Sequence, residues 1–183
     1  NNFDHVGADN RSVFPKIIKY LKEGGYRNIG IVSFSRNENG RERRAAFLEA
    51  MAEYNLPVNA RSCLDLSDCW NEAYDAARTI LSDRRNRPDV LLCFNDYVAN
   101  DVLNAAFDLG IRVPEELGII GFGNLPLTSR VRPRLTTVDQ FPGRIGQIAA
   151  ELLLNRISGK EKGDRKNILL PTELILRDSI RKH

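Results

Sequence analysis

Short, mainly apolar runs alternate along this chain with stretches whose apolar residues recur at helical spacing. Three such runs occupy residues 29–34, 90–94 and 117–122, and each is the right length for one buried strand. Helical spacing occupies residues 13–23, 43–54, 71–83, 97–109 and 143–157. Because strands that are apolar on both faces need helices on both sides, we predict an α/β fold with a doubly wound, mainly parallel sheet.

Glycine and proline mark the expected ends of these elements. Gly110 is predicted to end the helix before it, and Asn39–Gly40 to break the chain ahead of a helix that starts at Arg43. Two weaker patterns, at residues 61–66 and 168–176, predict a short strand and a final strand.

Each of the three apolar runs ends in a phenylalanine that polar or small residues follow. Ser35, Arg36 and Asn37 follow Phe34, Asn95 and Asp96 follow Phe94, and Gly123 and Asn124 follow Phe122. The carboxyl ends of parallel strands meet at one edge of a sheet, which is where open α/β sheets bind ligands. Amide side chains both donate and accept hydrogen bonds, so these tips predict a site for a neutral polyhydroxyl ligand rather than a nucleotide.

The same residues also have purely structural explanations. Asp96 could serve only to cap the helix that follows it, and Asn124 could serve only to stabilise the turn before Pro126. Residues 35–37 also fit an ordinary loop. The sequence leaves these alternatives open.

Composition argues against catalysis and against a metal site. The only histidines, His5 and His183, lie near the two ends, which excludes a Ser-His-Asp arrangement within the chain. Cys63, Cys69 and Cys93 form no C-x-x-C pair, and no phosphate-binding P-loop is present. The net charge of +3 is not clustered as in a DNA-binding face, and no apolar run reaches membrane-spanning length. We therefore predict no enzyme, no cofactor, no metal and no membrane partner.

Several ordered blocks carry a family resemblance over nearly the whole chain. They lie at residues 6–10, 20–32, 94–99, 109–122, 133–138 and 170–179. The block at 94–99 contains N-D-x-x-A, the block at 133–138 reads P-x-L-T-T-V, and the last block reads L-P-x-x-L-x-x-R-x-S. In this order and spacing they resemble the LacI/GalR family of transcription regulators.

The resemblance implies a periplasmic-binding-protein-like type I fold, in which three crossovers join two subdomains. Residues 1–138 would form the C-terminal subdomain, residues 139–166 a returning helix of the N-terminal subdomain, and residues 167–183 the final strand and tail. This chain would then be mostly the C-terminal subdomain.

The implied function is the binding of an effector, expected to be a sugar or sugar derivative, in a homodimeric cytoplasmic repressor. Operator DNA would be contacted only through an N-terminal headpiece that we expect to be missing here. A solute-binding protein of a sugar transport system shares the fold and is the alternative.

Three effector contacts follow from the resemblance by position. Arg43 matches the arginine of the family's R-x-x-G-[FYW] motif, whose planar fork grips hydroxyls or a carboxylate. Asn95 matches an asparagine that bonds a sugar hydroxyl. Gln140 matches a polar hinge position just beyond the crossover strand.

An aromatic side chain often stacks on the sugar in this family. Trp70 lies close to that place in the sequence, although it could equally pack against Tyr74. The complete predicted effector site comprises Arg43, Trp70, Asn95, Asp96, Asn124 and Gln140.

Two positions depart from the family pattern. Where the family has an aspartate that accepts bonds from the effector this chain has Gly123, and Ala46 stands where the family has glycine. A hydrogen bond to a charged group is worth roughly 1.5–3 kcal/mol, so its loss would weaken a standard sugar about ten- to a hundredfold unless Asn124 or another group substitutes. The lost carboxylate and the nearby arginines leave room for an acidic or phosphorylated sugar.

Overall fold

The computed structural model describes residues 3–68 and 71–183, and its main body is built on one six-stranded sheet. The strand order is β3 (Cys63–Asp65), β2 (Ile29–Ser33), β4 (Val90–Cys93), β5 (Gly118–Phe122), β6 (Thr136–Asp139) and β8 (Glu173–Ile175). All neighbouring pairs are parallel except β6 and β8, which are antiparallel. The predicted α/β fold with a mainly parallel sheet is confirmed.

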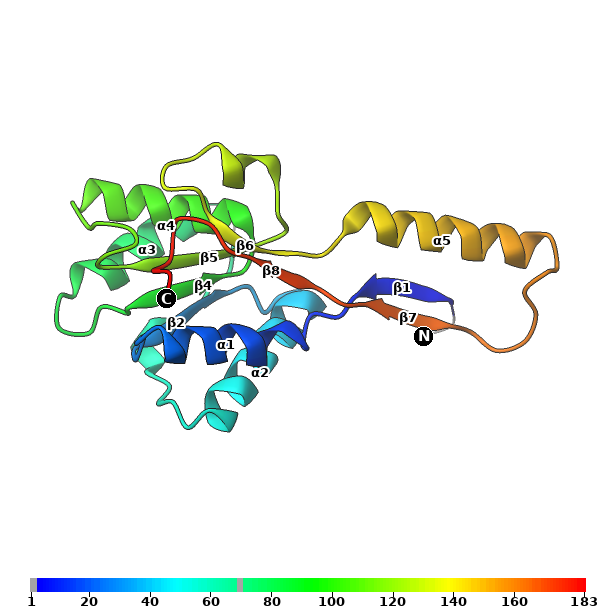
Figure 1. Ribbon diagram of the computed structural model, residues 1–183, viewed down its shortest axis with the longest axis horizontal. Helices are drawn as coiled ribbons and strands as arrows, with labels where there is room; N and C mark the ends of the chain where they lie inside the picture. Colours follow the sequence, from blue (N-terminus) through cyan, green and yellow to red (C-terminus); the bar gives the residue numbers. More distant parts are fainter. Residues whose placement is uncertain (1–2, 69–70) are drawn as a thin grey trace.

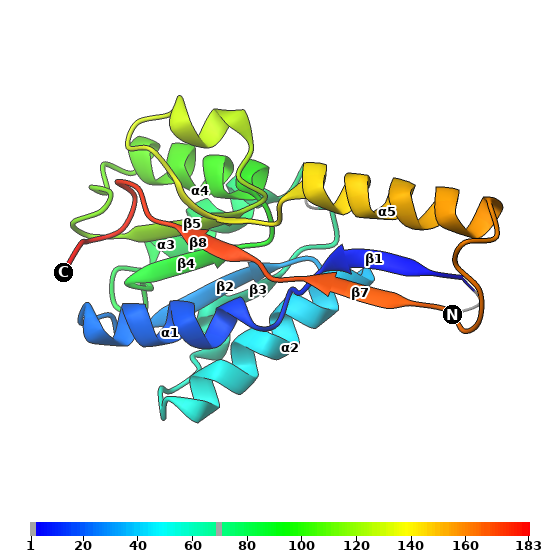
Figure 2. The same ribbon diagram turned by 45° about the vertical axis from the view of Figure 1, so that its right-hand side comes forward.

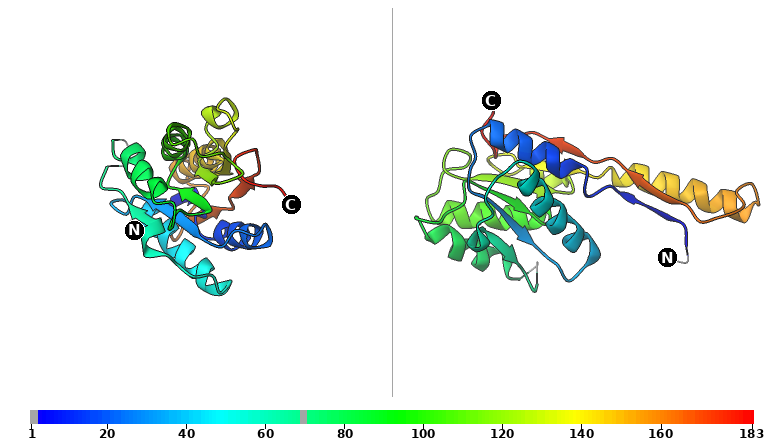
Figure 3. Two further views of the ribbon diagram at one scale, coloured as in Figure 1. Left: turned by 90° about the vertical axis from the view of Figure 1, so that its left-hand side faces the viewer. Right: turned by 90° about the horizontal axis from the view of Figure 1, so that it is seen from below.

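Two helices cover each face of this sheet (Figure 1; Figure 3, left). Helices α1 (Val13–Glu23) and α2 (Glu38–Glu53) pack on one face, and α3 (Ala73–Ser82) and α4 (Asp96–Asp108) on the other. Successive strand residues point to opposite faces, so Leu92 of β4 joins the first core and Leu91 the second. This double burial explains why the central strands β4 and β5 carry no polar or charged side chain except the thiol of Cys93.

Helix α2 begins earlier than predicted, at Glu38, and includes the Asn39–Gly40 pair that was expected to break the chain. Asn37 caps the helix, since its Oδ1 accepts a hydrogen bond of 2.7 Å from the Gly40 amide. A Cβ atom at Gly40 would lie 1.8 Å from the carbonyl oxygen of Phe34. Gly40 is therefore needed for the close approach of helix and strand rather than for a turn.

A second group of elements projects from the main body (Figures 1 and 2). Strand β1 (His5–Ala8) pairs in parallel with β7 (Asn167–Leu170), and α5 (Pro142–Ile157) lies against β1. The structure thus places residues 5–8 with α5 and β7, away from the six-stranded sheet. The chain crosses between the two groups three times, at residues 9–12, 140–141 and 171–172.

The predicted final strand over residues 168–176 is in fact two strands, β7 and β8. They are separated at Pro171, which has no N–H to donate to a continuous ladder. The short strand predicted at 61–66 is confirmed only for β3, because Ala60–Ser62 form a 3₁₀ turn. Among the described helices none has the length and apolar character that crossing a membrane requires.

Candidate functional site

The tips of β2, β4 and β5 meet around the side chain of Arg43, which α2 supplies. The Arg43 guanidinium carbon lies 3.8 Å from the ring centroid of Phe122 and 5.3 Å from that of Phe94. The Phe94 ring in turn packs against Phe34, with centroids 5.6 Å apart. The three phenylalanines that end the apolar runs therefore share one edge of the sheet, as the parallel topology predicts.

Arg43 is held in place by two hydrogen bonds and is 7% exposed. Its Nη1 donates to the backbone oxygen of Phe94 at 2.6 Å, and its Nε donates to Oδ1 of Asn10 at 3.2 Å. Burial lowers the pKa of Arg43 to about 10, and the charges of Glu42 and Asp96 oppose that shift. The side chain is still a cation at neutral pH.

Asn10, on the first chain crossing, connects Arg43 to the second crossing. Its Nδ2 donates to Oδ1 of Asn39 at 3.1 Å and to Oε2 of Glu42 at 2.9 Å, while its Oδ1 also accepts from Nε2 of Gln140 at 3.4 Å. Sequence reasoning placed Gln140 correctly at a crossing but missed Asn10 as a site residue. The available signal was that Asn10 ends the first block of the family resemblance.

A cavity of about 430 Å³ opens beside this cluster. Asn10, Glu42 and Gln140 line it together with residues of β1 and β7, so it lies between the main body and the projecting elements. Its volume is within the range of small-molecule sites, roughly 300–1,000 Å³. Its lining is largely polar, which suits a hydrogen-bonding ligand.

Asn95 and Asp96 have different roles at the start of α4. Asn95 is the helix cap, and its Oδ1 accepts from the Val98 amide at 2.8 Å. Asp96 is fully buried; its Oδ1 accepts from the Thr137 hydroxyl at 2.6 Å and its Oδ2 from the Leu125 amide at 2.7 Å. Burial raises the pKa of the Asp96 carboxyl, against the effect of these bonds.

With no exposed surface, Asp96 offers nothing that an effector could touch in this conformation. It instead ties the loop after β5 to β6, which makes it a positioning residue. Gly121 makes room for it, because a Cβ atom there would lie 2.2 Å from Asp96 Oδ1.

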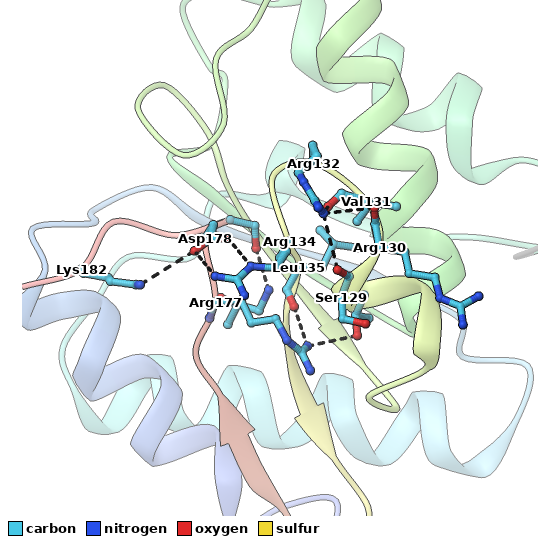
Figure 4. Close-up of polar contacts among 12 residues, drawn as sticks. Ser129, Arg130, Val131, Arg132, Arg134, Leu135, Arg177, Asp178 and Lys182 are labelled. Atoms are coloured by element: carbon cyan, nitrogen blue, oxygen red, sulfur yellow. Dashed lines mark hydrogen bonds and ion pairs between the residues drawn. The ribbon is translucent and has the colours of Figure 1, made fainter.

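Asn124 is also engaged within the protein. It has a left-handed backbone (φ 52°), its Nδ2 donates to Asp139 at 2.8 Å, and its Oδ1 accepts from Nη2 of Arg177 at 2.6 Å. Arg177 donates further to the Leu135 carbonyl at 2.8 Å (Figure 4). Arg177 was missed as a site residue, although it is the arginine of the closing family block.

A neighbouring ion pair fastens the end of the chain near this loop. Nε of Arg134 lies 2.6 Å from the Asp178 carboxylate, and Lys182 lies 3.8 Å from the same group (Figure 4). The C-terminal segment is thereby fixed beside β6, next to Arg177.

Trp70 lies outside the described residues, so neither stacking on a ligand nor packing on Tyr74 is tested. The hydroxyl of Tyr74 itself hydrogen-bonds Asp108 of α4.

Comparison with known proteins decides the family. Residues 18–180 match the family model described as a periplasmic binding protein-like domain. The chain belongs to this family, as a LacI-type effector-binding domain. Its curated relatives are transcriptional repressors, which confirms the prediction that the domain is not an enzyme.

This domain and its relatives are identical at about a third of the aligned positions. It is 34% identical over 165 residues to the transcriptional repressor PurR of Vibrio vulnificus, covering 90% of this chain and 49% of that protein. It is also 34% identical over 164 residues to PurR of Yersinia pestis, covering 88% and 47%. The chain thus spans about half the length of the curated relatives it matches.

Solved structures agree with this assignment. A LacI-family regulatory protein from Chloroflexus aggregans superimposes with a TM-score of 0.88 at 27% identity, over 100% of this chain and 66% of that one. The regulator CelR, solved in complex with cellobiose, superimposes with a TM-score of 0.87 at 24% identity, over 97% and 54%. At 24% identity, the similarity to CelR shows a common fold and nothing more.

Proposed function

We propose that this domain is the effector sensor of a transcription repressor and binds a small polar molecule beside Arg43. The observation that carries this proposal is the linkage of Arg43 through Asn10 to Gln140. One buried cation at the strand tips is hydrogen-bonded to the first chain crossing, which in turn contacts the second. A ligand that contacts Arg43 therefore acts on the segments that join the two groups of elements.

The expected mechanism is a change in the balance between two orientations of those groups. A ligand shifts such an equilibrium only when its contacts differ between the two states. Hinge segments are a few residues that absorb the change in backbone angles, and residues 9–12, 140–141 and 171–172 meet that description. The six-stranded sheet with its four helices would move as one body, and α5, β1 and β7 as part of the other.

The proposed effector is a sugar or sugar derivative. The polar cavity of about 430 Å³ and the amide group of Gln140 support it, since amides both donate to and accept from hydroxyls. Asn95 and Asn124 hold helix α4 and the loop after β5 in position, and Trp70 is proposed as a stacking surface. We further propose that the whole protein acts in the cytoplasm and contacts operator DNA through a segment outside this chain.

We also propose a homodimer that forms through the exposed side of α4. Phe107 on that helix is 81% exposed, and a groove lined by Leu103, Ile111, Val113 and Pro133 lies beside it. Exposed apolar surface of this kind commonly marks a protein interface. Sedimentation of the Phe107→Asp variant should show monomers where the parent shows dimers.

Isothermal titration of the full-length protein against a panel of sugars tests the effector proposal, with operator binding followed by fluorescence anisotropy. We expect one panel member to bind and to change operator affinity. The Arg43→Gln variant should bind it roughly 10- to 100-fold more weakly, because a charge-assisted hydrogen bond is lost. The proposal fails if no small molecule binds or if a bound one leaves operator affinity unchanged.

A further inference from the structure

Phe141, in the second crossing, has a backbone conformation that the local sequence disfavours. Its φ of 50° and ψ of 55° lie in the left-handed region, which bulky side chains rarely adopt. The next residue is Pro142, and a residue that precedes proline prefers extended backbone angles. Strain of this kind persists only where surrounding contacts impose it, and it is concentrated at ligand sites and switches. The contacts that hold Phe141 are therefore candidates for a functional role.

The conformation of Phe141 turns the chain from β6 into α5 (Figures 1 and 2). The Phe141 carbonyl oxygen accepts hydrogen bonds in the first turn of that helix, from the amides of Arg144 at 3.0 Å and Ile145 at 3.1 Å. The Phe141 amide itself donates to Oδ1 of Asp139 at 2.7 Å. Since Asp139 is the last residue of β6, its carboxylate holds the backbone at the point where α5 leaves the six-stranded sheet.

The other oxygen of Asp139 is bonded to the loop after β5. Its Oδ2 accepts from Nδ2 of Asn124 at 2.8 Å, and Oδ1 of Asn124 accepts from Nη2 of Arg177 at 2.6 Å. Because an arginine can only donate, Arg177 determines which end of the Asn124 amide faces Asp139. One carboxylate therefore joins the tip of β5 to the backbone of the second crossing.

Backbone donors of the same loop are also bonded to β6. The Gly123 amide donates to the Val138 carbonyl at 2.8 Å, and the Asn124 amide donates to the Thr137 hydroxyl at 3.3 Å. The loop after β5 and the last residues of β6 are thus fastened together at three neighbouring positions of that strand, 137, 138 and 139. A displacement of this loop therefore acts directly on Asp139.

We propose that Asp139 is a positioning residue that transmits movement of the loop after β5 to the second crossing. When the loop moves, Asn124 displaces or releases the Asp139 carboxylate, and Phe141 relaxes toward the extended angles that its sequence favours. Helix α5 then changes its direction relative to the six-stranded sheet. This inference rests on the proposed effector function, because an effector at the strand tips is what would move the loop. The hydrogen-bonded link itself can be tested without an effector.

Two substitutions that conserve side-chain size break the link from either end. Asp139→Asn turns an NH₂ group toward the NH₂ group of Asn124, and Asn124→Asp turns a carboxylate oxygen toward Asp139. Amide hydrogen exchange of residues 140–146 would be measured by mass spectrometry in the full-length protein. We expect it to be about tenfold faster in each variant, since a charge-assisted hydrogen bond is lost.

The double variant distinguishes transmission from local capping. Together the two substitutions reverse the hydrogen bond, because the new amide at 139 donates to the new carboxylate at 124, while Arg177 and Phe141 each keep an oxygen to bond. Exchange should return to within about twofold of the parent. Glu173→Gln is the matched control: it removes an exposed carboxylate directly across the β6–β8 ladder from Asp139 and should leave exchange unchanged.

Absence of rescue in the double variant, or unchanged exchange in Asn124→Asp, would overturn the inference, since Asp139 would then be only a local cap. An equal rise in Glu173→Gln would overturn it as well, because any carboxylate at this edge would then have the same effect.

Titration with D-ribose, D-glucose, D-galactose and cellobiose tests the effector function separately. A sugar that binds the parent should alter exchange at residues 140–146, and Asp139→Asn should bind that sugar without the alteration. If the alteration persists in Asp139→Asn, the inference is overturned and the effector function stands. If no sugar binds but the double variant restores exchange, the link through Asp139 stands and the effector function fails.

Discussion

Placing an aspartate at position 123 should destabilise this protein. Gly123 has a backbone φ of +132°, which residues other than glycine adopt only under strain. Such backbone strain costs about 1–3 kcal/mol. The Gly123→Ala variant isolates this cost, because alanine adds only the Cβ atom.

Gly123→Asp should cost more than Gly123→Ala. The new carboxylate would begin from a Cβ atom 3.3 Å from Oδ2 of the buried Asp96. Two unit charges about 4 Å apart repel each other by roughly 4 kcal/mol at an effective dielectric constant of 20. Rotation of the new side chain toward water relieves part of this repulsion, so we expect about 1–3 kcal/mol beyond the alanine variant.

Urea unfolding with linear extrapolation measures these free energies. Gly146→Ala is the matched control: Gly146 is inside α5, and a Cβ atom there meets no described atom within 4 Å. That substitution should stabilise the protein by roughly 0.5–1 kcal/mol. A Gly123→Ala variant within about 0.5 kcal/mol of the parent, the usual range for neutral surface changes, would refute the backbone argument. A Gly123→Asp variant as stable as Gly123→Ala would refute the electrostatic one.

Three further perturbations follow from the same structure. Asn10→Ala removes four hydrogen bonds around a side chain that is 4% exposed. The exposed partners can hydrogen-bond water instead, so we expect the free energy of unfolding, measured in urea, to fall by about 2 kcal/mol. An unchanged free energy of unfolding would contradict the proposal that Asn10 links the segments around it. Thr137→Val removes a donor from buried Asp96 and should cost about 1.5–3 kcal/mol at neutral pH. This difference in unfolding free energy should shrink as pH falls toward the raised pKa of Asp96, because protonation removes the buried charge. A difference that does not change with pH would contradict this role of the Thr137 hydroxyl. The hydrogen bond from Arg156 lowers the pKa of Asp4 from 3.8 to about 2, so its stabilisation of the β1–β7 pair is present above pH 3.8 and is lost as pH falls through about 2. Amide exchange in β1 should show this loss in the parent and not in Asp4→Asn.

Much of the main body is predictable from local sequence. The mainly apolar runs ending at Phe34, Phe94 and Phe122 form strands that are buried on both faces, and the ends of these strands meet at one edge. The prediction succeeds because a parallel topology determines which ends of the strands come together. Gly110 ends α4 as expected, with φ +66°.

Other features depend on partners far away in the chain. No local pattern shows that β1 pairs with β7, or that residues 168–176 divide into strands of two different sheets. The same is true of Asn10, whose partners are 29 to 130 positions away in the sequence. Asn39–Gly40 misled the prediction of α2, since the reason for Gly40 is contact with the Phe34 carbonyl, which becomes apparent only when helix and strand are packed.

By itself, then, the sequence determines that this is a layered α/β domain and which residues stand at the strand tips, because periodicity records burial. Only the tertiary structure decides what those tips do: Asp96 is fully enclosed, Asn124 is engaged by Arg177 and Asp139, and Arg43 is held by Asn10 and the Phe94 carbonyl. The physical reason is that a polar side chain can bind a ligand only with donors and acceptors that are not already hydrogen-bonded within the protein. Those groups come from segments that only folding brings together.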